Sequence, residues 1–196
     1  MRAACETDDI KDTDHNLIAT AELAGHCQGL RLESAWMSDW TYMDPEKVVL
    51  DKPYHFQGWY VEGGYLLFGG KQSYDSDGAK FNRVRTGRSW GDVELALKYE
   101  FLDMNDYEGR TTEQAIFGGS AELYGAGLNF YFGKNVKIAL NYQYVNNDRY
   151  ANGKGKLYVG LDADGNATKD YTKVVAKDGL AGINYHMLLA RFQVAF

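Results

Sequence analysis

The feature that most constrains the fold is a period-two alternation of apolar and polar residues, which recurs in seven segments of the chain. In the second segment, for example, Leu30, Leu32 and Trp36 alternate with Arg31 and Glu33. The seven segments are residues 17–24, 30–42, 57–68, 92–102, 123–132, 136–145 and 184–196. Because successive side chains of an extended strand point to opposite faces, each segment is predicted to be a β-strand with one apolar face.

Segment length and link length both favour strands that cross a membrane. Most segments have about the 9–11 residues that a tilted strand needs to span a bilayer. The links GHCQG and GKN are short, whereas the links after the second, fourth and sixth segments are long and polar. Outer-membrane barrels alternate short turns on one side with long loops on the other. The predicted fold is therefore all-β, an antiparallel transmembrane β-barrel to which residues 16–196 contribute about seven strands, with residues 1–15 as a loop or a truncated start.

The link formed by residues 69–91 does not fit this alternation, because its position predicts a short turn. One possibility is an excursion on the short-turn side, which lies outside the barrel or folds into it. The other is that the link contains a further strand pair near residues 80–85, KFNRVR. Gly, Ser and Asp dominate its first half, which favours the excursion.

Aromatic residues are placed as expected for strands that end at two lipid–water boundaries, where Trp and Tyr are favoured. The predicted outer rim comprises Trp40, Tyr42, Trp59, Tyr99, Phe101, Tyr142 and Tyr144. The predicted inner rim comprises Phe68, Phe130, Phe132, Phe192 and Phe196.

Other function classes have little support in the sequence. The net charge of −6 argues against a nucleic-acid partner. Cys5 and Cys27 have no metal-ligand spacing, and the four histidines lie in no nucleophile motif. Ser34 and Ser38 lie on a predicted strand without a motif partner, so no enzymatic activity, cofactor or metal site is predicted. LDADGNATKD at residues 161–170 lacks the full calcium-loop pattern and favours a simple Asp-Gly turn.

Several of these segments together resemble the C-terminal part of the phosphate- and polyphosphate-selective porin family. The resemblance is carried by FQGWYVEGGYLLFGG at residues 56–70, FNRV at 81–84 and WGDVELALKYEFLDMND at 90–106. It continues through YGAGLNFYF and VKIALNYQYV to the terminal FQVAF. The resemblance implies that about seven strands here belong to a 16-stranded barrel, usually trimeric, in the outer membrane of Gram-negative bacteria.

Candidate functional residues fall into three groups. The predicted pore-lining residues, together with Glu33, are Arg31, Glu62, Glu94, Lys98, Glu100, Lys137 and Arg191. Their mixed signs suit a general diffusion pore at least as well as a phosphate-selective one, since selectivity depends on rings of one sign. The anion-attracting candidates, together with Lys71, are Lys80, Arg83, Arg85 and Arg88, unless they form only a solvated turn or contact lipid headgroups. The third group, Phe192, Val194 and Phe196, is the predicted assembly signal.

The function that these expectations favour is a passive outer-membrane channel for small hydrophilic solutes, including anions such as phosphate. The expected partners are outer-membrane lipid, the barrel-assembly machinery, these solutes and further copies in a homotrimer. The alternatives are the closing strands of a plugged receptor and a soluble ligand-binding β-barrel. In the soluble alternative, Leu95, Leu128, Leu140 and Val194 would pack together in a dry interior.

Overall fold

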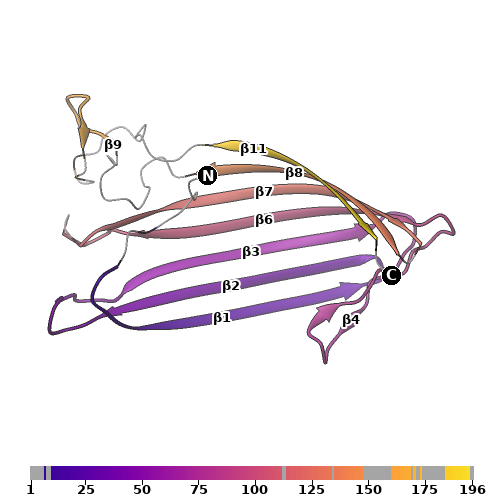
Figure 1. The fold of residues 1–196 in the computed structure, drawn as a ribbon, viewed down its shortest axis with the longest axis horizontal. Helices are drawn as coiled ribbons and strands as arrows, with labels where there is room; N and C mark the ends of the chain where they lie inside the picture. Colours follow the sequence, from indigo (N-terminus) through magenta and orange to yellow (C-terminus); the bar gives the residue numbers. More distant parts are fainter. Residues whose placement is uncertain are drawn as a thin grey trace.

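The computed structural model describes residues 7, 10–111, 114–133, 135–147, 160–168, 170, 173 and 184–194. Within this part of the chain, seven long strands form one antiparallel sheet in the order β1-β2-β3-β6-β7-β8-β11 (Figure 1). The strands are β1 (Thr13–Cys27), β2 (Leu30–Met43), β3 (Tyr54–Leu66), β6 (Asp92–Asp106), β7 (Ile116–Phe132), β8 (Val136–Asn147) and β11 (Tyr185–Val194). Among the described residues, no helix is long and apolar enough to span a membrane.

Each of the seven alternating segments corresponds to one of these strands, and neighbours in sequence are neighbours in the sheet. β3 ends at Leu66, however, two residues before the predicted end, and residues 195 and 196 of the last segment lie outside the described part of the chain. The strands extend beyond several of the predicted bounds: β1 begins at Thr13, and β7 begins at Ile116. In the described residues, β1 pairs only with β2 and β11 pairs only with β8, so the sheet has two edges and is not closed. The result is a sequential meander that forms part of a barrel wall.

One face of the sheet, which we call the apolar face, is covered by a continuous set of exposed hydrophobic side chains. One of its rows across the strands is Leu30, Tyr65, Leu95, Leu128, Leu140 and Ala190. Leu95, Leu128, Leu140 and Val194 are 42%, 39%, 46% and 41% exposed. These four residues do not meet in a dry interior, which contradicts the arrangement expected of a soluble barrel.

The opposite face, which we call the polar face, carries most of the Asp, Glu, Lys and Arg side chains of the strand interiors. One of its rows across the strands is Glu33, Glu62, Lys98, Gly125 and Gln143. Exposed hydrophobic residues also occur on this face, namely Ile18, Met37, Leu102 and Leu189. The separation of chemistry between the two faces is therefore strong but not complete.

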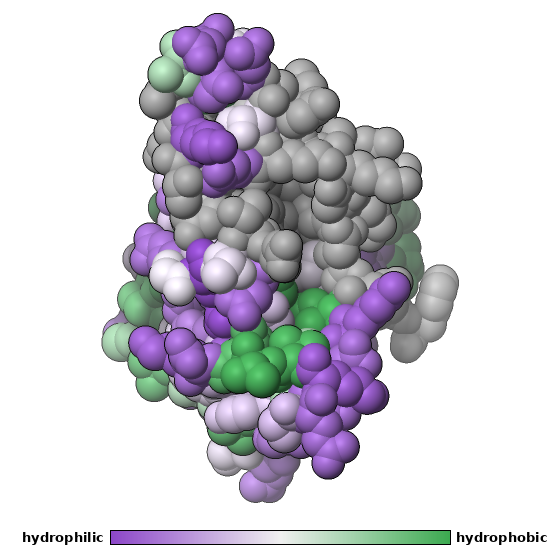
Figure 2. All heavy atoms as spheres, turned by 90° about the vertical axis from the view of Figure 1, so that its left-hand side faces the viewer, coloured by the Kyte–Doolittle hydropathy of each residue, from purple (hydrophilic) through white to green (hydrophobic). Residues whose placement is uncertain are grey.

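Apart from the β3–β6 connection, the connections between strands alternate in length as predicted. The β1–β2 and β7–β8 connections are short and lie at one end of the sheet, here called the short-turn end. The β2–β3, β6–β7 and β8–β11 connections lie at the other end, the long-loop end, on the left in Figure 1. Seen from the long-loop end, the described surface is mostly hydrophilic, with hydrophobic side chains at its flanks and in one patch between the loops (Figure 2).

The long β3–β6 connection lies at the short-turn end and adds no strand to the main sheet, as the excursion hypothesis predicted. It also contains a small hairpin of β4 (Tyr74–Asp75) and β5 (Lys80–Phe81), so a strand pair is present but is only two residues long on each side. A bridge between Lys71 and Arg85 continues the pairing toward the base of this excursion. The remaining short pair, β9 (Gly160–Leu161) and β10 (Ala167–Thr168), lies in the β8–β11 connection.

Aromatic rings form a row on the apolar face toward the long-loop end, where the outer rim was predicted. Ring centroids of Trp59 and Tyr99 lie 5.0 Å apart, and Tyr99 and Tyr124 are also 5.0 Å apart. Three histidines join this row through ring contacts, which the sequence did not indicate: His15 with Tyr42, His55 with Trp40, and His186 with Tyr144. Phe130, Phe132 and Phe192 lie on the same face toward the short-turn end, whereas Phe196 lies outside the described residues.

Candidate functional site

A network of charged side chains crosses the polar face near the short-turn end, centred on Arg31 of β2. Its Nε donates to Glu94 Oε1 on β6 at 2.8 Å, and its Nη1 donates to Glu62 Oε1 on β3 at 2.6 Å. Glu33 lies at a longer 3.4 Å from the same Nη1. One guanidinium therefore faces carboxylates from three neighbouring strands, and its positive charge is neutralised locally.

Glu94 is the buried member of this network, with 1% of its surface exposed. Its Oε2 accepts hydrogen bonds from Asn129 Nδ2 at 2.8 Å and from the Tyr131 hydroxyl at 2.7 Å, both on β7. Its Oε1 also accepts from Gln72 Nε2 at 3.3 Å, which belongs to the long β3–β6 connection. A buried carboxylate requires such partners, and these link β2, β6, β7 and the connection.

Glycine at position 64 provides the space for this network. A Cβ at Gly64 would overlap Glu94 Oε1 and lie 2.9 Å from Arg31 Nε. A side chain at this point of β3 would therefore push apart the two groups of the central ion pair.

Gly64→Ala is accordingly expected to destabilise the folded wall by about 1–3 kcal/mol through overpacking. Gly125→Ala is the matched control, because a Cβ there meets its nearest neighbour, Lys98 Cβ, at an ordinary 3.4 Å. Equilibrium unfolding of the membrane-inserted protein in urea compares the two variants. Equal losses of stability would contradict the proposed role of Gly64.

All seven predicted pore-lining residues lie on the polar face, but most of their charges are paired. Lys98 Nζ lies 2.6 Å from Glu100 Oε1 and 3.9 Å from Glu62 Oε2. Lys137 is half-buried with its Nζ 5.1 Å from the Tyr131 ring centroid, and Arg191 is exposed on β11. Pairing of this kind was not evident from the sequence, because Arg31 and Glu94 are far apart along the chain.

The residues 67–91, which we call the crossing segment, turn over the polar face at the short-turn end. Gln72 is 5% exposed and contacts Glu94, and the Arg31 guanidinium lies 6.0 Å from the centroid of the Phe81 ring. The backbone N–H of Gln72 also donates to Gln28 O in the β1–β2 turn at 2.6 Å. The crossing segment therefore extends from β3 and β6, across the charged network, toward the β1–β2 turn.

The crossing segment carries the anion-attracting candidates, and these are exposed. They are Lys71, Lys80, Arg83, Arg85 and Arg88. Within the described part of the chain, none of their side chains forms an ion pair. Their positive charges thus differ from those of Arg31 and Lys98, which lie against carboxylates.

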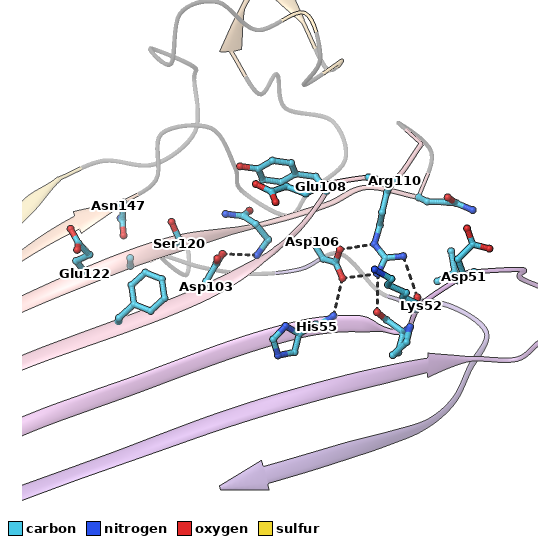
Figure 3. A pocket seen from close by; sticks show the side chains of 18 of the residues that line it. Asp51, Lys52, His55, Asp103, Asp106, Glu108, Arg110, Ser120, Glu122 and Asn147 are labelled. Carbon is cyan, nitrogen blue, oxygen red and sulfur yellow. Dashed lines mark hydrogen bonds and ion pairs between the residues drawn. The ribbon is translucent and has the colours of Figure 1, made fainter. Parts of the chain in front are cut away.

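A second polar region lies at the long-loop end, where a cavity of about 1230 Å³ opens between the connections (Figure 3). Arg110 Nη2 donates to Asp106 Oδ2 at 2.7 Å and to Pro53 O at 2.8 Å, and this hydrogen bonding with Asp106 raises the pKa of Arg110. Asp106 also accepts from the His55 backbone N–H at 2.8 Å. These contacts tie two connections together, and none of the residues was predicted as a site.

Ser38, which has no motif partner in the sequence, has a hydrogen-bond partner in the fold. Its Oγ lies 2.6 Å from Nε2 of His55, because the register pairs Ser38 with Gln57 and so places His55 diagonally across from Ser38 on β3. Ser38 is 0% exposed, however, so the hydroxyl is not accessible to a substrate. The contact stabilises the β2–β3 pairing beside the Trp40–His55 ring stack.

The stretch that resembles a calcium loop uses its first carboxylate for a turn. Asp162 Oδ1 accepts the backbone N–H groups of Asp164 at 3.0 Å and Asn166 at 2.8 Å. Among the described residues, no group of three or more His, Cys, Asp or Glu side chains is placed to hold a metal ion. Turn formation accounts for Asp162 in this stretch.

An antiparallel meander with an exposed apolar face, a charged opposite face and loop lengths that alternate between its ends defines part of the wall of a transmembrane β-barrel of the porin class. The model of the family "Phosphate-selective porin O and P" matches residues 3–196. The chain belongs to this family.

The chain is also similar, over a shorter stretch, to a curated relative. Porin O of Pseudomonas aeruginosa is 27% identical over 116 residues, which is 58% of this chain. The matched stretch spans 26% of the length of Porin O. Both the family and the relative are named as porins rather than as enzymes.

Proposed function

We propose that the chain forms part of the wall of a passive channel in the bacterial outer membrane, through which small hydrophilic solutes diffuse, including anions such as phosphate. The observation that carries this proposal is the division of the sheet into an apolar and a charged face. Family membership supports it, because the matching family is described as phosphate-selective porins. In this arrangement the apolar face contacts lipid, the polar face borders water, and the complete channel is a homotrimer inserted by the barrel-assembly machinery.

Within this proposal the strand residues and the crossing segment have different roles. Arg31, Glu62, Lys98 and Glu100 line the passage as mutually paired charges beside the buried Glu94, so that neither sign of charge dominates along the strands. Lys137 and Arg191 add positive charge at the short-turn end. The anion preference then comes mainly from Lys80, Arg83, Arg85 and Arg88, because exposed guanidinium and ammonium groups remain available to phosphate oxygens.

Neutralising part of the crossing segment is expected to reduce anion selectivity. The double variant Lys80→Gln/Arg83→Gln should shift the reversal potential in a KCl gradient toward that of a cation-preferring channel, because selectivity follows the sign of charge along the passage. Single channels in planar lipid bilayers provide the measurement.

The control removes two exposed lysines at the long-loop end, Lys47→Gln/Lys52→Gln. We expect little change of the reversal potential in this control. Shifts of equal size in both double variants would contradict a specific role of the crossing segment, and absence of conductance in the unaltered protein would contradict the channel itself.

A further inference from the structure

The carboxylate of Asp92 lies buried at the base of the crossing segment and is surrounded by backbone donors. Asp92 is 0% exposed. Its Oδ1 accepts the N–H groups of Phe68 at 3.0 Å and Val93 at 2.8 Å. Its Oδ2 accepts those of Gly70 at 2.8 Å and Gly87 at 2.9 Å. All four bonds are charge-assisted, which makes them stronger than neutral backbone bonds.

Three of the four donors belong to the crossing segment and come from both of its ends. Phe68 and Gly70 lie where the chain leaves β3, and Gly87 lies shortly before it enters β6. One side chain therefore joins the outgoing and the returning backbone. Backbone hydrogen bonds between Lys71 and Arg85, of 2.8 and 3.1 Å, run across the segment directly beyond this point.

Close packing of the backbone around the carboxylate requires glycine at two of these positions. A Cβ on Gly70 would lie 2.6 Å from Asp92 Oδ2 and 2.7 Å from Arg85 O. A Cβ on Gly87 would overlap Phe68 O and lie 2.6 Å from Gly70 N. The outgoing and the returning backbone can approach the carboxylate this closely only because Gly70 and Gly87 lack a side chain.

We propose that Asp92 is a positioning residue that fixes the crossing segment over the polar face. Its carboxylate holds the two ends of the segment together, and Glu94, through Gln72, holds the adjoining stretch against the network. The cations of the segment are thereby kept at one place beside the passage. This consequence for solutes rests on the proposed channel function, whereas the fixation itself does not.

Limited trypsin digestion of the detergent-extracted, assembled protein tests the fixation, because the segment contains five exposed Lys and Arg residues. In Asp92→Asn and Asp92→Ala, cleavage within residues 71–88 is expected to be about tenfold faster or more, since losing charge-assisted bonds raises the open population. Asp75→Asn is the control, because Asp75 accepts only the N–H groups of Asp77 and Gly78 in its own turn among the described contacts. Cleavage at the rate of the unaltered protein in assembled Asp92 variants would overturn the proposal.

A second measurement needs no substitution and so remains decisive if the variants fail to assemble. In the unaltered protein, amide hydrogen exchange at Gly70 and Gly87 should be much slower than at residues 76–79 of the hairpin tip. Rapid exchange at Gly70 and Gly87 would overturn the proposal.

The reversal potential separates positioning from general stability. In Asp92→Asn we expect anion selectivity to be lost. The temperature at which heating shifts the barrel to a different position in gel electrophoresis should stay unchanged. A loss of selectivity only together with a lower transition temperature would overturn the positioning role. If the unaltered protein does not conduct, the channel proposal fails, whereas trypsin cleavage and hydrogen exchange still decide whether Asp92 fixes the segment.

Discussion

Glu94→Ala is expected to destabilise the folded wall by about 3–5 kcal/mol, the usual cost of removing one partner from a buried ion pair. The side chain is 1% exposed and accepts hydrogen bonds from Arg31, Gln72, Asn129 and Tyr131. Its removal leaves several buried donors without their acceptor. The effect should lie toward the lower limit, because Arg31 keeps its contact with Glu62.

Glu100→Ala is the matched control for this prediction. Its side chain is 38% exposed and lies against Lys98, and an exposed pair of this kind contributes only about 0–1 kcal/mol. Urea unfolding of the membrane-inserted protein measures both variants. A similar loss in both would show that the Glu94 network does not stabilise the wall beyond an ordinary surface pair.

Leu140→Arg is expected to reduce membrane insertion strongly. Leu140 lies on the apolar face between the phenylalanines near the short-turn end and the aromatic row near the long-loop end. An arginine facing lipid near the middle of a bilayer costs about 2–4 kcal/mol in a β-barrel. The fraction of heat-modifiable protein in outer membranes measures this effect.

Gln143→Arg, on the same strand but on the polar face, should insert normally because its side chain borders water. The pair of variants therefore tests the assignment of faces with one kind of substitution. Normal insertion of Leu140→Arg together with failure of Gln143→Arg would mean that the apolar face points inward, and the channel proposal would then be untenable.

The strands and their order were predictable because the signal for them is local. Side-chain alternation in residues 92–102 or 136–145 requires no knowledge of distant residues, and short links such as GKN permit only antiparallel neighbours. Strand ends were less predictable, since β6 continues to Asp106 through polar residues that backbone pairing with β7 holds in place.

The chemistry of the polar face was only partly predictable. The alternation placed Arg31, Glu62 and Glu94 on one face, but it did not indicate that they neutralise one another. Likewise, Ser38 and His55 belong to different strands, and their hydrogen bond depends on the register between β2 and β3. Asp92 was assigned no role, because its four donors are recognisable only when the crossing segment is folded.

The sequence by itself determined a sheet with two chemically different faces, because the period of side-chain direction in a strand is two and the apolar residues follow it. Only the tertiary structure decided which charges are paired and which remain exposed, because pairing depends on strand register and on the path of residues 67–91 across the polar face. Register brings residues from distant parts of the chain within hydrogen-bonding distance, and no local pattern of the sequence encodes that distance.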